Sequence, residues 1–300
     1  MKITIRESVT RDGWQNYKTF IPTDKKIELA KEIIDAGARK MDLISFVRTD
    51  FVPQFVEAEE VVKGVLPYAK EQGCEIYGGG SNKKGAERAL SCGIKNVIMG
   101  VSVSDEHSVR NARRSVEQAF AELKTLVSDL QGSDVNIHVG LPCVFGSPFG
   151  DEVSIDRVIY MIDELVQMGV NDIGLPDSAG ISTPDHTRAV LKQLLSRFPA
   201  DIFGCHFHNT RGMGLANAYV AYEEGIREFD TALGGMGGCP FIENAKGNIA
   251  TEDLVNMFQM MGVDTGYDVE TLVSLSLKMG QEIGTEIISY MANLQCCSNR

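Results

Sequence analysis

The sequence predicts one (β/α)8 barrel followed by extra helices. Short apolar runs typical of strands alternate about eight times with segments whose apolar residues recur at helical spacing. The connections are short, and 300 residues suit a single closed α/β barrel. A doubly wound open sheet would show the same alternation. No G-x-G-x-x-G opens a helix after the first strand, which weakens the dinucleotide-binding version of that sheet.

Eight apolar segments are the expected strands. They span residues 3–5, 40–46, 75–77, 96–99, 135–139, 172–175, 202–207 and 228–233. The expected helices between them span residues 23–37, 54–69, 82–92, 104–130, 155–168, a segment from 183 onward, and 215–224. Thr23 and Thr183 suit N-caps, and Pro184 suits the first turn of its helix. Gly37 and Gly93 are expected to end their helices.

The whole chain is expected to form one domain. The barrel occupies about residues 1–250, and a helical extension occupies about residues 251–300. Helical patterns at 254–261 and 269–279 predict helices that pack against the barrel. No low-complexity linker separates the two parts, so a second core is not expected.

Composition limits the function classes. Hydrophobic residues make up 43% of the chain, which is enough for a full core. The formal net charge of −12 argues against nucleic acid or an anionic membrane as a partner, because phosphate binding needs a basic surface. No segment approaches the roughly 18 apolar residues that a membrane span needs, and no signal peptide is evident. Seven scattered cysteines without C-x-x-C indicate reduced thiols and a cytoplasmic protein.

Two histidines end the seventh expected strand. His206 and His208 are two residues apart, so in an extended segment both side chains point the same way. They can present two imidazoles to one metal ion. The alternative is a pair that only forms hydrogen bonds near a strand end. The chain has five histidines in all, and Asp12, in the polar turn after the first strand, is a candidate third ligand, although an Asp-Gly pair also suits a plain turn.

Reactive residues of a barrel lie at the C-terminal ends of its strands. We expect one mouth to collect the polar residues at these ends, which are Arg11, Asp12, Asp42, Ser45, Cys143, Asp177, Ser178, His206, His208, Cys239 and Asn248. Two imidazoles and a carboxylate suit Mg²⁺ or Mn²⁺, and Zn²⁺ or Co²⁺ also fit the set. Asn248 adds a weak oxygen ligand or is simply a turn residue after Gly247.

Several motifs give the chain a family resemblance. It resembles the 3-hydroxy-3-methylglutaryl-CoA lyases, within the metal-dependent barrel lyases and synthases. The matching segments are Arg11-Asp12-Gly13-Trp14-Gln15-Asn16, Ser45-Phe46-Val47, Val52-Pro53-Gln54, His206-Phe207-His208-Asn209-Thr210, Leu215-Ala216-Asn217, Gly237-Gly238-Cys239-Pro240 and Gly247-Asn248-Ile249-Ala250-Thr251-Glu252-Asp253. The last two are the most specific, because related synthases usually lack this pair.

The resemblance implies a reaction and roles. The reaction is cleavage of a 3-hydroxy-acyl-CoA to acetyl-CoA and a 3-keto acid, acetoacetate for the leading substrate. The implied metal ligands are Asp12, His206, His208 and Asn248. The implied catalytic residues are Arg11, Cys239, Asp42 and Asp177. The implied substrate and CoA contacts are Gln15, Lys18, Ser45 and Ser178. The family also implies a homodimer.

Some positions depart from the family pattern. Asp42 stands where the lyases usually carry Glu, and Asn209 where they carry Asp. The other departures are Tyr17, Arg48, Ser147 and Pro176. The proposed ligands are intact, so these changes bear on the acyl group rather than on the reaction class.

Three other functions compete with this one. One is a lyase for another branched 3-hydroxy-acyl-CoA. Another is a Claisen-type synthase that joins acetyl-CoA to a 2-keto acid; such enzymes commonly have a further C-terminal domain, which a chain ending at Arg300 is not expected to have. The last is a catalytically silent barrel that serves as a binding or scaffold subunit. The glycine-rich segment before Cys239 is expected to act as a lid; a tight turn or a phosphate cradle are its alternatives.

Overall fold

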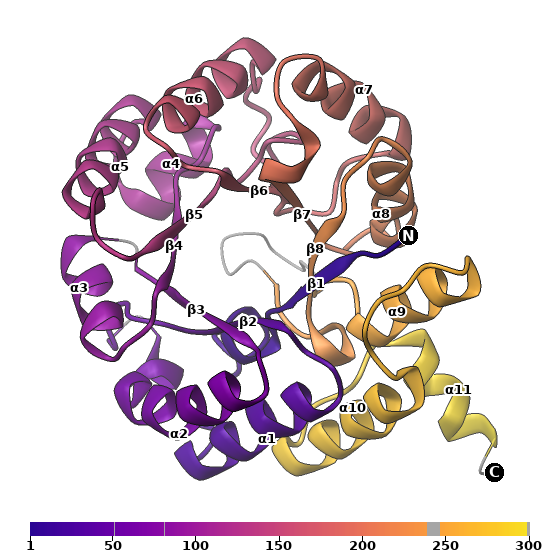
Figure 1. Cartoon of the computed structure of the whole chain (residues 1–300). Coiled ribbons are helices and arrows are strands. Elements are labelled where there is room, and N and C mark those ends of the chain that lie inside the picture. The colour runs from indigo at the N-terminus through magenta and orange to yellow at the C-terminus, as the bar shows by residue number, and fades with distance from the viewer. Residues whose placement is uncertain (51, 81, 239–246, 299–300) are drawn as a thin grey trace.

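Eight parallel strands close into a barrel in the computed structural model, which describes residues 1–50, 52–80, 82–238 and 247–298. Each strand pairs with its neighbours in sequence, and β8 pairs with β1. Helices surround the strands as an outer ring (Figure 1). The predicted barrel is therefore confirmed.

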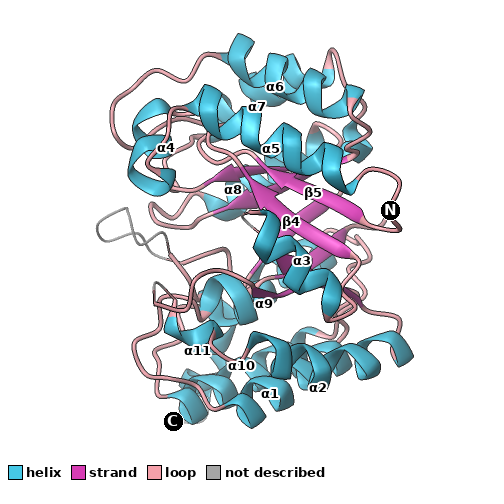
Figure 2. Ribbon diagram, turned by 90° about the vertical axis from the view of Figure 1, so that its left-hand side faces the viewer, coloured by secondary structure: helices cyan, strands magenta, loops and turns pink. Residues whose placement is uncertain are grey.

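The strands start and end close to their predicted positions. They are β1 (Thr4–Glu7), β2 (Lys40–Ser45), β3 (Glu75–Gly79), β4 (Asn96–Gly100), β5 (Asn136–Gly140), β6 (Asp172–Asp177), β7 (Phe203–Phe207) and β8 (Glu228–Thr231). Because all eight are parallel, their C-terminal ends meet at one mouth. The side view in Figure 2 shows β4 and β5 running in the same direction across the barrel.

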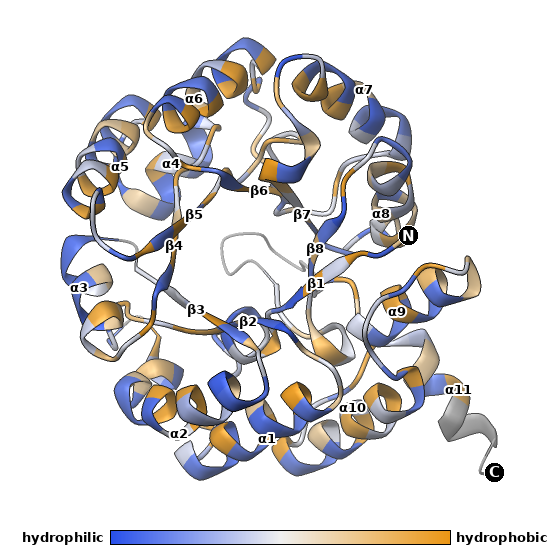
Figure 3. Ribbon diagram, viewed as in Figure 1, coloured by the Kyte–Doolittle hydropathy of each residue, from blue (hydrophilic) through white to orange (hydrophobic). Residues whose placement is uncertain are grey.

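The ring helices bury one face each against the strands. They are α1 (Thr23–Asp35), α2 (Ala58–Glu71), α3 (Lys83–Ser91), α4 (Asp105–Ala112), α5 (Val116–Leu130), α6 (Ile155–Gln167), α7 (Pro184–Leu195) and α8 (Gly214–Glu223). In α1 the buried residues include Leu29, Ala30, Ile33 and Ile34, which share one face at helical spacing. Figure 3 shows this mixture of hydrophobic and hydrophilic residues around the ring. Thr183 caps α7 and accepts a hydrogen bond from the His186 amide, as predicted.

One predicted helix is in fact two. The segment 104–130 divides into α4 and α5, and the break lies at Arg113, whose φ of 56° is left-handed. The Arg113 amide still donates to the Val109 carbonyl at 2.9 Å, but its left-handed backbone turns the chain out of the helix after this residue. Ser115 then starts α5 with a capping box that includes Gln118. The uniform charge pattern of this segment hid the break, and the separation leaves α4 as a short helix of its own.

The barrel interior is polar. Arg6 of β1 is fully buried, and it donates hydrogen bonds to Asp230 and Glu228 of β8 at 2.9 and 2.8 Å. Its Nη1 lies 2.9 Å from Nδ1 of His138 on β5, and its guanidinium lies over the ring of Tyr77. A buried guanidinium needs such partners, because an unpaired buried charge is costly. The main apolar core lies between the strands and the ring helices.

Three further helices extend the barrel. They are α9 (Thr251–Met260), α10 (Val269–Ile283) and α11 (Tyr290–Ser298), and α10 lies beside α1 (Figures 1 and 2). Lys278 of α10 pairs with Glu32 of α1. Asp253 of α9 accepts hydrogen bonds from the Tyr290 and Met291 amides at 3.0 and 2.9 Å, which fixes the start of α11. No helix in the described ranges is long and apolar enough to cross a membrane.

Candidate active site and metal centre

A cavity of about 340 Å³ opens at the C-terminal ends of the strands. Its wall includes residues from the turn after β1, from β2 to β8 and from α4. Among the predicted site residues, the lining contains Arg11, Asp12, Gln15, Asp42, Ser45, Ser178, His206 and His208. The structure therefore brings most of the predicted site to one place.

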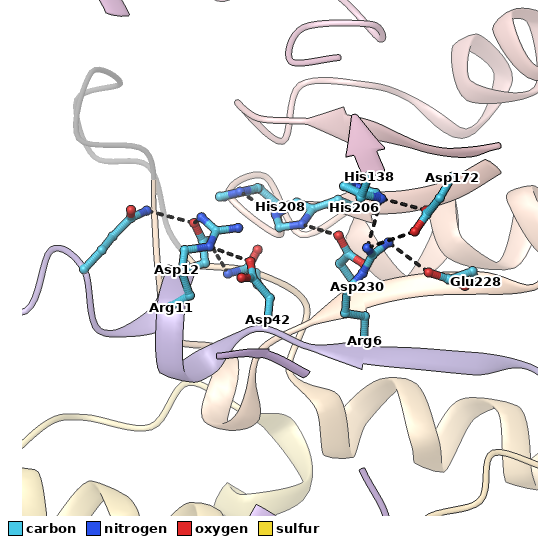
Figure 4. A network of polar contacts seen from close by, with 12 residues as sticks. Arg6, Arg11, Asp12, Asp42, His138, Asp172, His206, His208, Glu228 and Asp230 are labelled. Carbon is cyan, nitrogen blue, oxygen red and sulfur yellow. Dashed lines mark hydrogen bonds and ion pairs between the residues drawn. The ribbon is translucent and has the colours of Figure 1, made fainter. Parts of the chain in front are cut away.

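The two histidines face one another across a short gap. His206 lies in β7, and His208 follows the strand and forms a β-bridge with Asn248. Their Nε2 atoms are 3.2 Å apart, and both residues are buried. Ligand atoms of Asp12, His206 and His208 all lie within 4.8 Å of one another. The predicted three-ligand cluster is thus assembled, as Figure 4 shows.

Asp12 lies in a π-helical turn, Val9–Gly13, that follows β1. Its Oδ1 accepts hydrogen bonds from Arg11 and Gln15, both at 2.8 Å. Burial by itself would raise the pKa of Asp12, but Arg11 and the two imidazoles outweigh burial and lower that pKa. Asp12 is consequently an anion at neutral pH, which is the form that binds a cation.

Asn248 completes this side of the site. Its Nδ2 donates to Oδ2 of Asp12 at 2.7 Å and to the Met236 carbonyl at 3.0 Å. Its Oδ1 is buried and has no hydrogen-bond partner within the described part of the chain. A buried amide oxygen without a partner is costly, so it marks a place where a ligand is expected.

These residues fit a divalent cation. Around an octahedral ion with bonds of about 2.1 Å, neighbouring ligand atoms lie about 3 Å apart, close to the 3.2 Å between the two Nε2 atoms. The cluster offers one ring nitrogen from each histidine and one carboxylate oxygen, and Asn248 offers a spare oxygen. This mixed nitrogen and oxygen set suits Mg²⁺, Mn²⁺, Co²⁺ or Zn²⁺.

Asp230 supports His206 from behind, and the sequence reasoning missed it. Its Oδ2 lies 3.2 Å from Nδ1 of His206, and its Oδ1 accepts from Arg6. Burial favours a higher pKa for Asp230, but Arg6 and His206 hold this pKa far below its usual range. Asp230 lies two residues after Glu228 on the same face of β8 and pairs in register with His206. Only the strand pairing, which the sequence does not show, reveals this contact.

Arg11 is held by two carboxylates. Its Nε donates to Oδ2 of Asp42 at 2.6 Å, and its Nη1 donates to Asp12. Asp42 is almost fully buried, and burial raises its pKa although Arg11 opposes that rise. The other oxygen of Asp42, Oδ1, has no hydrogen-bond partner among the described residues. The arrangement fixes a permanently charged guanidinium beside the three candidate metal ligands.

The remaining predicted residues differ in their positions. Ser45 and Ser178 line the cavity. Asp177 does not belong to the lining, and its two oxygens accept the backbone amides of Ile181 and Ser182 at 3.1 and 3.0 Å. Lys18 is exposed and also lies outside the lining. Cys239 lies outside the described residues. The roles of these five residues stay predictions.

Several of the departures have structural contacts away from the metal cluster. Asn209 accepts a hydrogen bond from the Gly214 amide at the start of α8. Tyr17 donates to backbone carbonyls at the end of α10, and Arg48 pairs with Asp50 at the surface. Ser147 contacts Ser104 and Asp151. None of these four lines the cavity, whereas Pro176 does.

Comparison with known proteins agrees with this geometry. The HMGL-like family model matches residues 2–278. The hydroxymethylglutaryl-CoA lyase of Bacillus subtilis is 34% identical, over 98% of this chain and 97% of that protein. The (R)-citramalyl-CoA lyase of Chloroflexus aurantiacus is 31% identical, over 94% of this chain and 91% of that protein.

A solved structure has the same fold. The HMG-CoA lyase from Acinetobacter baumannii, in complex with coenzyme A and 3-methylmalate, superposes with a TM-score of 0.92 and 34% sequence identity. That match covers 97% of this chain and 94% of the other. The family model spans most of the chain and the relatives are more than 30% identical over nearly its full length, so the chain belongs to the HMGL-like family.

Proposed function

We propose that the protein is a metal-dependent lyase that cleaves 3-hydroxy-3-methylglutaryl-CoA to acetyl-CoA and acetoacetate. The observation that carries the proposal is the cluster of Asp12, His206 and His208 in the cavity wall, with Arg11 beside it. Membership of the HMGL-like family and the similarity to hydroxymethylglutaryl-CoA lyases support it.

In this proposal Asp12, His206 and His208 hold a divalent ion, and Asn248 assists through its spare oxygen. When bound, such an ion supplies Lewis acidity and so favours loss of the proton from a substrate hydroxyl. We favour Mg²⁺ or Mn²⁺, because the set contains oxygen ligands and no thiolate. Asp230 keeps the proton of His206 on Nδ1, which leaves Nε2 available as the ligand atom.

Arg11 serves the bond-breaking step. As the bond between C2 and C3 breaks, the electron pair moves toward the thioester oxygen, and the C3 hydroxyl becomes a ketone. A fixed guanidinium next to that oxygen stabilises the developing negative charge. Asp42 and Asp12 fix Arg11 in place before the substrate arrives. The C3 hydroxyl loses one proton and C2 gains one to give acetyl-CoA, so the reaction has no net proton change. Cys239 is the predicted donor to C2.

The test is a cleavage assay on the full chain. Protein treated with a chelator and reloaded with Mg²⁺ or Mn²⁺ is incubated with 3-hydroxy-3-methylglutaryl-CoA, and acetoacetate is measured. We expect metal-dependent acetoacetate formation. Citramalyl-CoA belongs in the same assay because one relative is a citramalyl-CoA lyase, and its product, pyruvate, is distinguishable. Pyruvate without acetoacetate would move the proposal to that substrate.

Two further predictions accompany the proposal. The protein acts as a homodimer, and it works in the cytoplasm. Size-exclusion chromatography with light scattering tests the first, and fractionation of the source cells tests the second.

A further inference from the structure

One row of the cavity wall consists of glycines. Four glycines stand in register on neighbouring strands, Gly100 of β4 opposite Gly140 of β5, Gly174 of β6 and Gly204 of β7. The first three line the cavity. A (β/α)8 barrel normally fills its interior with bulky residues, so this row leaves space where side chains are expected.

At two of these positions the surroundings would accept a residue with a side chain. A Cβ on Gly140 would meet nothing nearer than 3.8 Å, and one on Gly100 nothing nearer than 3.5 Å. Neither has the positive φ that favours glycine. Gly174 is different, because a Cβ there would come within 2.7 Å of His138. The space beside Gly100 and Gly140 is therefore open to a substrate.

A buried histidine lines the same cavity. His107, in the first turn of α4, is 3% exposed, and its ring stacks on Phe149. Its Nδ1 has no hydrogen-bond partner within the described ranges. Asn111, one turn further along α4, also lines the cavity and is exposed. Figure 1 places α4 beside β4 and β5, across the barrel from β8 and β1.

The ring of His107 is uncharged, although charged residues lie nearby. Burial lowers the pKa of His107, and Asp151 only partly offsets this effect, so the ring is neutral at pH 7. Asp151 itself is bonded to Ser104 and Ser147. The neighbouring Arg110 lies over the Phe149 ring and pairs with Glu106. A neutral imidazole and an amide suit a hydroxyl or carbonyl group better than a carboxylate.

We propose that His107 is a specificity residue for an acyl group larger than hydroxymethylglutaryl. The substituent on C3 extends from the metal cluster over Gly100 and Gly140, and an uncharged polar group at its end bonds to His107 and Asn111. The substrate class is a 3-hydroxy-acyl-CoA with a hydroxyl or carbonyl on a C3 branch longer than methyl. This inference rests on the proposed lyase function.

A substrate series tests it. The C3 methyl of hydroxymethylglutaryl-CoA is replaced by propyl or by 2-hydroxyethyl. The two groups have the same length, and the terminal methyl of one is a hydroxyl in the other. We expect the wild-type enzyme to prefer 2-hydroxyethyl over propyl in kcat/KM. His107→Phe keeps an aromatic ring against Phe149 but removes the nitrogen atoms. The variant should remove this preference by lowering kcat/KM for the 2-hydroxyethyl substrate about tenfold or more. It should leave kcat/KM for the methyl substrate unchanged.

A second variant tests the glycine wall. Gly140→Ala adds one methyl group without a steric clash. It should lower kcat/KM for both long substituents and spare the methyl substrate. His186→Phe, at an exposed histidine of α7, is the matched control and should change nothing. An equal effect of His107→Phe on all substrates, or no effect, would overturn the proposal and leave the lyase function standing.

Binding separates this inference from the proposed function. Dissociation constants of the same thioesters are measured by calorimetry on metal-loaded protein carrying Arg11→Met, with and without His107→Phe. A selective preference for 2-hydroxyethyl that His107→Phe abolishes supports the inference even if the wild-type protein cleaves none of the thioesters. Equal affinities for the propyl and 2-hydroxyethyl thioesters would overturn it. Absence of cleavage by the wild-type protein counts only against the lyase function.

Discussion

Nδ1 of His206 lies 3.2 Å from Oδ2 of Asp230, and this contact decides which ring nitrogen faces the metal cluster. A proton on Nδ1 is held by the carboxylate, so Nε2 keeps its lone pair and points to Nε2 of His208. Arg6 in turn holds Asp230, so the support for the ligand runs through the polar interior of the barrel (Figure 4).

Asp230→Asn should weaken metal binding. The amide keeps the shape of the carboxylate but does not hold the His206 proton as strongly. We expect a loss in affinity on the order of 10- to 100-fold, measured by calorimetric titration of Mn²⁺ into chelator-treated protein. Glu228→Gln is the control, because Glu228 lies on the same strand and contacts Arg6 and Lys40 but no histidine. An Asp230→Asn protein with wild-type affinity would show that His206 does not need this partner.

Arg11→Met should depress turnover and leave metal content unchanged. The variant removes the cation that, in the proposed mechanism, faces the thioester oxygen. Loss of one such donor costs on the order of 10² or more in rate. Turnover is measured with saturating substrate, and metal content by elemental analysis. Arg48→Met removes an exposed arginine paired with Asp50 and serves as the control. Turnover near the wild-type value would exclude Arg11 from the bond-breaking step.

Glu252 should make stability depend on pH. Its side chain is fully buried, and burial raises its pKa to about 7. Between about pH 4.5 and 7 the carboxyl group of Glu252 is therefore protonated in the folded protein and ionised in the unfolded chain, whose pKa is near 4.5. This stabilisation is complete below about pH 4.5 and is lost as the pH rises through about 7, a change on the order of 3 kcal/mol.

Urea unfolding between pH 5 and 8 measures this effect. Glu252→Gln should flatten the decrease in the free energy of unfolding that the wild-type protein shows over this range. Glu270→Gln, at an exposed position of α10, should keep the decrease. Parallel curves for the wild type and Glu252→Gln would mean that Glu252 is ionised in the folded protein.

The sequence was sufficient to predict the barrel and the group of three candidate metal ligands. Strand and helix periods recur through the whole chain, so the alternation could be read locally. His206 and His208 could be paired because residues two apart in a strand share a face. Asp12 could be added because every parallel strand delivers its following turn to the same mouth.

Contacts that depend on register could not be read in this way. Asp230 supports His206 only because β7 and β8 pair in the register that the barrel imposes. His107 lines the cavity from α4, a separate short helix that ends at Arg113 and that the sequence pattern did not distinguish from α5. Asp177 accepts backbone amides of the turn that follows it, and its catalytic role stays a prediction. Local patterns predict elements, whereas these contacts arise between distant elements.

Metal stoichiometry in His208→Ala tests the central claim most directly. Wild-type protein and the variant are stripped with a chelator, reloaded with Mn²⁺, desalted and assayed for bound metal. His186→Ala, at an exposed histidine, is treated in parallel. We expect about one equivalent in the wild type and in His186→Ala, and almost none in a folded His208→Ala protein. Stoichiometric metal in His208→Ala would contradict the site built from Asp12, His206 and His208.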